Sequence, residues 1–353
     1  MTPASAGTSL SVGEVDQVNM KQSTVYLAQP LEICGKKIKN RIVVPPMADF
    51  GMTEPDALVN SRHIERYGAY AKGGAGLIII EACAVTKMPE PRNTIGLFSD
   101  NCLPGLKRLA QAVTENGAVA LVQLMETGLS TMPYHAIAEI PEKEFLRYKE
   151  DFIRAAVRCK QAGFDGIELH AAHGMYLNQI IETSERQDGY GGSFEGRVRV
   201  LVELVREIKK LCGESFIVAV RFGNPDYGEL VQTAITIEQA GGDLLDVSTG
   251  MSGYRDVPLQ FQFDSKIYAA SMVKDKVSLP VIGVGNIQTG DQAEKVLVYK
   301  YADMMAIGRG HLCDPEWANK ALHGEQPILC RKCKTCIWYI DGRKCPVHQG
   351  GVL

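Results

Sequence analysis

The chain has 353 residues, of which 45% are hydrophobic and 22% are charged, and its formal net charge is −3. This length suits one large α/β barrel or two average domains, and the composition is that of an ordinary globular protein. The small negative charge gives no electrostatic case for binding nucleic acid or an anionic membrane surface. No apolar run reaches the length of a membrane span and no signal peptide is evident, so we expect a cytoplasmic protein.

Residues 1–23 carry Ser, Thr and Gly without periodicity, which predicts a flexible N-terminal tail. From Ile42 onward, short β-branched runs alternate with amphipathic helical patterns. The predicted strands are Ile42–Val44, Leu77–Ile80, Val119–Gln123, Gly166–Leu169, Phe216–Arg221, Leu244–Val247, Val281–Val284 and Met304–Ile307. The predicted helices are 62–72, 104–116, 143–162, 195–212, 230–240, 265–277, 289–300 and 315–323.

Strands that are apolar on both faces and alternate with helices indicate a parallel sheet with right-handed crossovers. Eight such units within residues 24–325 predict an α/β protein with a (β/α)8 TIM barrel. A doubly wound sheet is the alternative. It is disfavoured because no G-x-G-x-x-G motif follows a predicted strand.

The active site of a (β/α)8 barrel lies at the C-terminal ends of its strands. In this chain, chemically distinctive residues lie at the C-terminal ends of the predicted strands. Each of them alone is weak evidence, but their joint placement indicates an active site. They are Pro46, Met47, Ala48, Glu81, Gln123, His170, His173, Arg221, Gly285, Asn286, Gly308 and Arg309.

Two groups of these residues suggest specific chemistry. His170 and His173, three residues apart after a strand, can offer two N–H donors to one oxygen and so polarise a carbonyl without a metal. The alternative is that both histidines bond to backbone groups. Gly285 and Gly308 follow the last two strands, and with Arg309 they predict a phosphate site. The alternative there is that the glycines only permit tight turns.

Ten cysteines are present, and four of them crowd into residues 326–353. Cys330, Cys333, Cys336 and Cys345 form a C-x2-C-x2-C-x8-C pattern. Consecutive two-residue gaps favour an iron–sulfur cluster of the [4Fe–4S] type, with zinc as the alternative. The sequence therefore predicts a short cysteine-rich, metal- or cluster-binding extension after the barrel.

Several segments carry a family resemblance: Lys39–Met47, Leu103–Lys107, Val122–Leu124, His170–Gly174, Arg186–Ser193, Val281–Gly285 and Ala306–Arg309. Through them the chain resembles the old yellow enzyme family, the FMN-dependent NADH:flavin oxidoreductases. It is most similar to the branch that contains 2,4-dienoyl-CoA reductase and trimethylamine dehydrogenase, of which it would represent the barrel domain. The resemblance runs from about Leu31 to Cys345.

The resemblance implies a role for each matched residue. It implies that Pro46 and Met47 line the flavin ring, with Ala48 in place of the usual Thr or Cys, and that Gln123 and Arg221 bond its pyrimidine side. It implies that His170 and His173 hold the substrate carbonyl. The residues implied to hold the phosphate are Gly285, Asn286, Gly308 and Arg309.

The implied reaction is the reduction of an activated C=C bond beside a carbonyl, by hydride transfer from reduced FMN. Where the family has a Tyr that protonates the product, this chain has Met175, so the proton would come from Tyr176 or from water. Flavin-dependent oxidation of an amine or N-methyl substrate is one alternative. An electron-transfer subunit without ene-reductase activity is another. Electrons would come from NAD(P)H or a partner protein, and the chain is compatible with a homo-oligomer.

Overall fold

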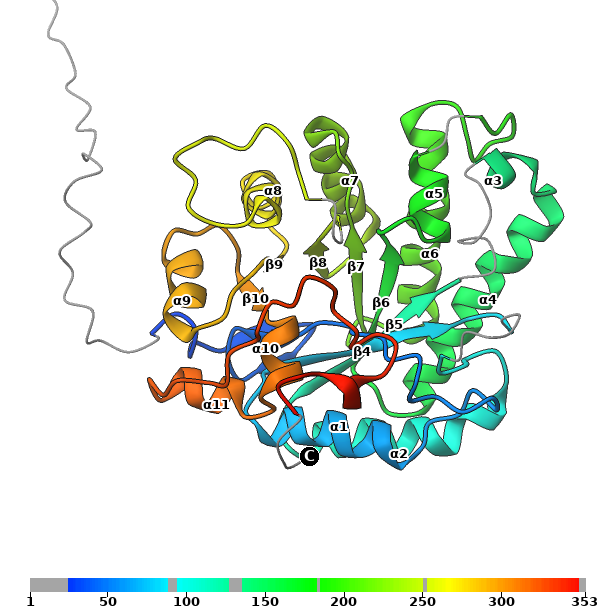
Figure 1. Ribbon diagram of the computed structural model, residues 1–353. Helices are drawn as coiled ribbons and strands as arrows, with labels where there is room; N and C mark the ends of the chain where they lie inside the picture. Colours follow the sequence, from blue (N-terminus) through cyan, green and yellow to red (C-terminus); the bar gives the residue numbers. More distant parts are fainter. Residues whose placement is uncertain (1–24, 88–93, 127–134, 183–184, 250–252, 349–353) are drawn as a thin grey trace, which may run out of the picture.

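Eight parallel strands form the centre of the protein. The computed structural model describes residues 25–87, 94–126, 135–182, 185–249 and 253–348, so the predicted tail at 1–23 lies outside the described residues. The strands close into a barrel in the order β10-β3-β4-β5-β6-β7-β8-β9, which confirms the predicted TIM barrel and excludes the doubly wound sheet (Figure 1). Their bounds are β3 Ile42–Val44, β4 Leu77–Ala84, β5 Val119–Met125, β6 Gly166–Ala171, β7 Ile217–Phe222, β8 Leu244–Val247, β9 Val281–Val284 and β10 Met304–Ala306.

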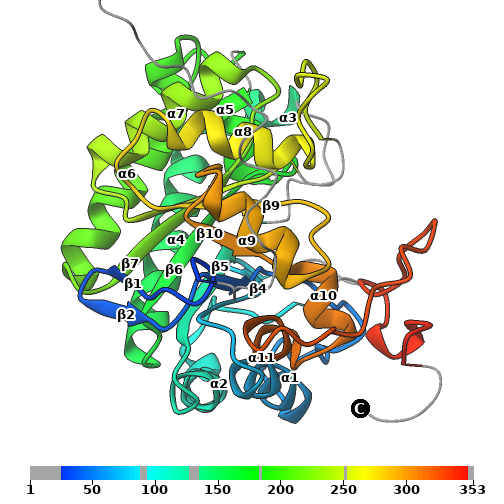
Figure 2. The ribbon, with the colours of Figure 1, turned by 90° about the vertical axis from the view of Figure 1, so that its left-hand side faces the viewer.

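Helices follow the strands and cover the outside of the barrel (Figure 2). Each predicted helix has a counterpart: α1 Ser61–Lys72, α2 Leu103–Thr114, α4 Glu142–Gln161, α6 Phe194–Cys212, α7 Tyr227–Ala240, α8 Ser265–Lys274, α9 Gly290–Val298 and α11 Trp317–Leu322. The sequence did not predict the short elements, which are α3 His135–Glu139, α5 Tyr176–Glu182, α10 Gly308–Cys313, η1 Asp100–Cys102 and η2 Gly342–Lys344.

Alternate residues of each strand point into the barrel, as the period of a strand requires. On β7, Ile217 and Ala219 belong to the inner apolar cluster, whereas Val218 and Val220 pack outward against the helices. The same inward row continues to Arg221 at the C-terminal end of β7. The inward-facing residues are apolar at the N-terminal end of the barrel and polar at the C-terminal end, where the predicted site residues lie.

A β-hairpin that the sequence did not predict closes the N-terminal end of the barrel. Strand β1 (Leu31–Ile33) pairs antiparallel with β2 (Lys36–Ile38). Cys34 and Gly35 join them with φ values of 50° and 72°, the left-handed conformation of a tight hairpin turn. Because Ile33 and Ile38 belong to the inner cluster, the hairpin seals the barrel interior from below.

Strand β4 is longer than predicted. It runs from Leu77 to Ala84, so Glu81 lies within the strand and not after it. The pairing of β4 with β5 shifts register between Ile80 and Cys83, and this irregularity lets the strand continue.

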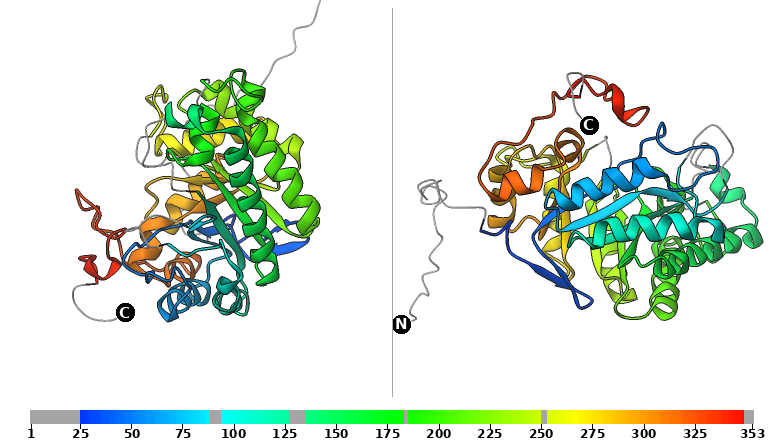
Figure 3. Two further views of the ribbon diagram at one scale, coloured as in Figure 1. Left: turned by 90° about the vertical axis from the view of Figure 1, so that its right-hand side faces the viewer. Right: turned by 90° about the horizontal axis from the view of Figure 1, so that it is seen from below.

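The C-terminal extension runs past α10 and α11 to the side of the barrel that carries α1 (Figure 3). The Phe50 N–H donates to the carbonyl of Tyr339 (3.0 Å), and the Arg66 guanidinium lies 5.0 Å from the centre of the Trp338 ring. These contacts tie the extension to the loop after β3 and to α1. Within the described ranges, no helix combines the length and the apolar character that crossing a membrane requires.

Candidate active site

A cavity of about 740 Å³ lies at the C-terminal end of the barrel, where the sequence placed the site. The predicted residues that line it come from strand β7, from the segments that follow β3, β6, β9 and β10, and from the extension. They are Pro46, Met47, Ala48, His173, Arg221, Gly285, Asn286, Gly308, Arg309, Cys330, Cys333 and Cys336. The other predicted site residues, which do not line it, are Glu81, Gln123, His170, Tyr176 and Cys345.

A polar network forms one wall of the cavity. Arg309 donates through Nη2 to the side-chain oxygen of Asn286, whose Nδ2 donates to Asp264 Oδ2 (2.6 Å). Lys266 Nζ lies 2.9 Å from Asp264 Oδ1. Lys266 pairs with the carboxylate and Arg309 is linked to it only through Asn286, so the wall has a net positive charge suited to phosphate. Sequence patterns did not single out Lys266 and Asp264, because Asp264 has the position of an ordinary N-cap at the start of α8.

Gly285 is required by its surroundings. A Cβ atom at this position would lie 2.5 Å from Cβ of Asp264, closer than such atoms approach one another. The absence of a side chain lets the backbone after β9 pass close to the start of α8. The positive wall and the end of β9 are thereby brought together at one edge of the cavity.

The two predicted histidines lie together. Their ring centres are 5.0 Å apart and the rings are nearly perpendicular. His173 has a φ of 63°, and its Nε2 is hydrogen-bonded to Ser248 Oγ (2.9 Å). His173 lines the cavity, whereas His170 lies behind it, 6% exposed.

Both histidines are neutral at physiological pH. Burial and the positive charges of Arg221 and Lys266 lower the pKa of His173 to about 3. Burial, followed by the effects of His173 and Arg221, lowers the pKa of His170 well below its ordinary value. A neutral imidazole carries one N–H, so each ring can donate one hydrogen bond and remain uncharged.

Tyr176 lies in an aromatic cluster and does not line the cavity. Its ring stacks on Phe152 with centroids 6.4 Å apart and meets the edge of Tyr148 at 5.3 Å. The side chain is 1% exposed, and burial raises the pKa of its phenol well above the ordinary value. The preceding residue, Met175, is half-buried.

Glu81 supports the loop after β3. Its Oε2 accepts a hydrogen bond from the Asp49 N–H (3.2 Å), and its Oε1 lies 3.4 Å from His63 Nε2. Glu81 thus holds the loop that leads from Met47 to Asp49, so it positions cavity residues and does not touch the cavity itself.

A buried polar layer crosses the barrel beneath the cavity. Gln123 Nε2 donates to Glu168 Oε1 (2.7 Å), and Arg221 Nε lies 3.3 Å from Asp246 Oδ2 without hydrogen-bond geometry. Burial and the charge of Asp246 raise the pKa of Glu168 to about 8, although Arg221 acts in the opposite direction. Burial also raises the pKa of Asp246, and Arg221 opposes this shift.

The four cysteines of the extension line a second cavity of about 140 Å³ beside the first. In the part of the chain that the structure describes, however, no group of three or more His, Cys, Asp or Glu side chains is arranged to hold a metal ion. A fifth cysteine lies close to this set. Burial and then the neighbouring Cys330 and Cys345 raise the pKa of Cys313 to about 12.

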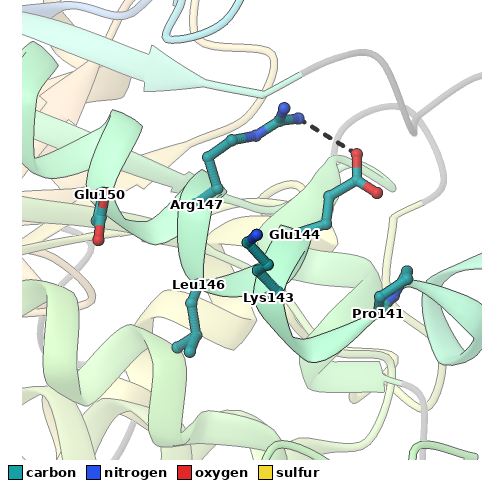
Figure 4. Close-up of a pocket in the computed structure, with 6 residues that line it drawn as sticks. All are labelled: Pro141, Lys143, Glu144, Leu146, Arg147 and Glu150. Carbon is teal, nitrogen blue, oxygen red and sulfur yellow. Dashed lines mark hydrogen bonds and ion pairs between the residues drawn. The ribbon is translucent and has the colours of Figure 1, made fainter.

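A further hollow of about 640 Å³ lies on α4, away from the strand ends. Figure 4 shows its side chains, among which Arg147 and Glu144 form an ion pair (3.2 Å). All of its lining residues lie between Pro141 and Glu150, and none is a predicted site residue. We therefore assign the candidate active site to the barrel mouth.

The sequence profile of the NADH:flavin oxidoreductase / NADH oxidase family matches residues 26–139 and 130–327, which is most of the chain. The chain belongs to this family. The resemblance drawn from the short motifs is thereby confirmed, and the protein is a member of the NADH:flavin oxidoreductase family of enzymes. The match spans the barrel strands and ends before the four cysteines.

Two curated relatives of this NADH:flavin oxidoreductase family member, and one solved structure with a similar fold, are informative. An NADH oxidase of Thermoanaerobacter brockii is 37% identical over 343 residues, which cover 87% of this chain and 52% of that protein. A metal reductase of Desulforamulus reducens is 31% identical over 339 residues, covering 88% of this chain and 50% of that protein. The chain thus spans about half the length of these curated relatives. A 2-naphthoyl-CoA reductase–2-naphthoyl-CoA complex shares the fold, with a TM-score of 0.78 and 22% identity over 90% of this chain and 55% of that chain.

Proposed function

We propose that the cavity at the barrel mouth binds FMN, the flavin implied by the family. The donor set fits this group: Arg309 and Lys266 form a cationic wall at one edge, and Arg221, which also lines the cavity, carries a buried positive charge. The volume of about 740 Å³ lies within the usual range of cofactor sites. Gly285, Asn286, Gly308 and Arg309 would hold the phosphate, and Pro46, Met47 and Ala48 would line the ring.

We propose that the enzyme reduces an activated C=C bond next to a carbonyl, with NAD(P)H or a partner protein as the electron source. Bound FMN supplies the hydride chemistry, and the protein supplies position and polarisation. The observation that carries this proposal is the pair of neutral histidines at 5.0 Å, one of them on the cavity wall. An N–H donor directed at a carbonyl oxygen stabilises the negative charge that develops there during hydride addition. His173 would donate from the cavity wall, and His170 packs against its ring from behind.

We propose water as the source of the second proton. Tyr176 is held in an aromatic cluster behind the loop, and Met175 carries no proton to donate. A Tyr176→Phe variant tests this directly. The solvent isotope effect and turnover should match those of the parent enzyme, whereas a large loss of turnover would return the proton-donor role to Tyr176.

An electron-transfer role for the extension is the second candidate. Cys330, Cys333 and Cys336 line the same cavity as the proposed flavin residues, which favours a redox group there. With Cys345 they would hold a [4Fe–4S] cluster, or zinc as the alternative. The four thiols share a cavity without forming a ready ligand set in the described residues, so we derive no electron-transfer step through them. Iron and sulfide analysis of anaerobically purified protein decides between these metals.

The test of the proposed reaction compares His173→Ala with His173→Asn in stopped-flow mixing of the reduced enzyme with an enone. Loss of a donor to a developing oxyanion costs about a hundredfold or more in rate. We expect that loss in His173→Ala and a smaller loss in His173→Asn, whose amide keeps an N–H donor. Equal rates for the parent and His173→Ala would contradict the role. Faster reaction of the oxidised enzyme with amines than of the reduced enzyme with enones would favour amine oxidation.

A further inference from the structure

The barrel interior carries more negative charge than its one arginine balances. Glu168 on β6 and Asp246 on β8 are both 0% exposed, and Arg221 on β7 is the cation that acts on both of them. If both carboxylates were ionised, this layer would hold one uncompensated negative charge away from water. A buried charge without a partner costs several kcal/mol, and such a group usually becomes neutral instead.

The contacts indicate which carboxylate becomes neutral. Asp246 Oδ2 lies 3.3 Å from the Arg221 guanidinium, whereas Glu168 Oε1 accepts only from the uncharged amide of Gln123. Glu168 Oε2 is buried without a hydrogen-bond partner among the described residues. The charge of Arg221 therefore favours the ionised form of Asp246 more directly than that of Glu168.

The other groups that face Glu168 do not supply a compensating charge. Gln123 on β5 is uncharged, and His170, two residues further along β6, is neutral because burial lowers its pKa. Glu81 on β4 is engaged with the Asp49 N–H and with His63. The charged groups that act on Glu168 are thus the carboxylate of Asp246 and the guanidinium of Arg221, which Glu168 shares with Asp246.

We propose that Glu168 is a neutral carboxylic acid in the resting protein and that it acts as a positioning residue for Gln123. The amide nitrogen of Gln123 is fixed on Glu168 Oε1, which turns the amide oxygen of Gln123 away from this contact. A neutral Glu168 also leaves Asp246 as the counter-charge of Arg221 and adds no negative charge beneath the cavity. The effect of Glu168 on the charge beneath the cavity rests on the proposed FMN site, because this charge would act on the reduced flavin.

The protonation state can be tested in the protein without flavin. Infrared titration should show the carbonyl band of a protonated carboxylic acid at mildly acidic pH, which disappears as the pH rises through about 8. The band should be absent from Glu168→Gln. In Asp246→Asn it should still be present at acidic pH but disappear at a lower pH than in the parent protein, because the charge of Asp246 that raises the pKa of Glu168 is gone. A band that persists in Glu168→Gln and is lost in Asp246→Asn would place the proton on Asp246 and overturn the inference. Absence of the band from the parent protein would overturn it as well.

The effect on the flavin can be tested by potentiometry of the FMN-loaded protein. Ionisation of Glu168 adds a negative charge near the reduced flavin, so the plot of midpoint potential against pH should change slope near pH 8 in the parent protein. Glu168→Gln should lack this change, and the exposed control Glu32→Gln on β1 should keep it. The same change in Glu168→Gln would show that the group titrating near the flavin is not Glu168 and would contradict its proposed effect on the charge there.

The two tests separate the inference from the proposed function. If the protein takes up no FMN, the proposed function fails while the infrared titration still decides the state of Glu168. If FMN binds and the acid band is missing, only the inference about Glu168 fails. Should Glu168→Gln not fold, the infrared titration of the parent protein and of Asp246→Asn decides the same question.

Discussion

His173 illustrates how one buried side chain links stability to pH. The unfolded chain protonates this histidine near pH 6.5, whereas the folded protein binds that proton only near pH 3. The folded pKa is depressed, so the free energy of unfolding falls as the pH drops through this window. Urea midpoints at about pH 7 and about pH 4 should differ less in His173→Gln than in the parent protein. An unchanged difference, with the exposed His323→Gln as control, would show that His173 binds its proton as readily in the folded protein as in the unfolded chain.

Arg309 gives a second prediction at the scale of the residue. It is a cation on the cavity wall beside Asn286, and charge-assisted bonds to phosphate are about twice as strong as neutral ones. Arg309→Ala should weaken FMN binding by about tenfold to a hundredfold, and Arg309→Lys by less. Fluorescence titration of the flavin-free protein measures both, with the exposed Arg154→Ala on α4 as the matched control. Unchanged affinity in Arg309→Ala would place the phosphate elsewhere.

At the scale of the element, Asp49 fixes the extension on the barrel. Its Oδ2 accepts from Arg66 Nη2 (2.6 Å) on α1 and from the N–H of Gly342 (3.3 Å) in the extension. Asp49→Ala removes both contacts and should expose residues 325–348 to limited proteolysis while the barrel remains resistant. The control is Asp275→Ala at the end of α8, where the carboxylate is 82% exposed. Equal cleavage of the two variants would show that other contacts hold the extension.

The regular elements were predictable because their signals are local. Each long helix repeats apolar residues at helical spacing, so the predicted helix 195–212 is observed as Phe194–Cys212. The hairpin β1–β2 was missed because its strands have three residues each and include Lys36 and Lys37. Glu81 was assigned to a strand end because a register shift inside β4 leaves no clear mark in the sequence.

The candidate site was predictable where strands end and unpredictable where distant loops meet. Met47, His173, Arg221 and Arg309 each follow or end a strand, and the structure brings all four to one cavity. Lys266 joins them from the start of α8, a position that reads from the sequence as a surface helix. The backbone conformation of a loop decides which of its side chains enters the cavity. The hydrophobic periodicity of the sequence does not reveal that conformation.

At the scale of the whole molecule, the barrel and the extension form two walls of one cavity. The chain spans about half the length of its curated relatives. The predicted boundary at residue 325 between barrel and extension also stays a prediction. The fold supplies a closed barrel whose mouth has a cationic wall and the neutral His173, with His170 and a buried polar layer behind them.

FMN binding at this opening can be measured by adding FMN to the anaerobically prepared, flavin-free protein and recording the visible absorption spectrum after gel filtration. We expect one FMN to co-elute with each chain, with the flavin bands shifted from those of free FMN, and FAD to be excluded. A colourless protein fraction after incubation with excess FMN would show that the opening does not bind this flavin.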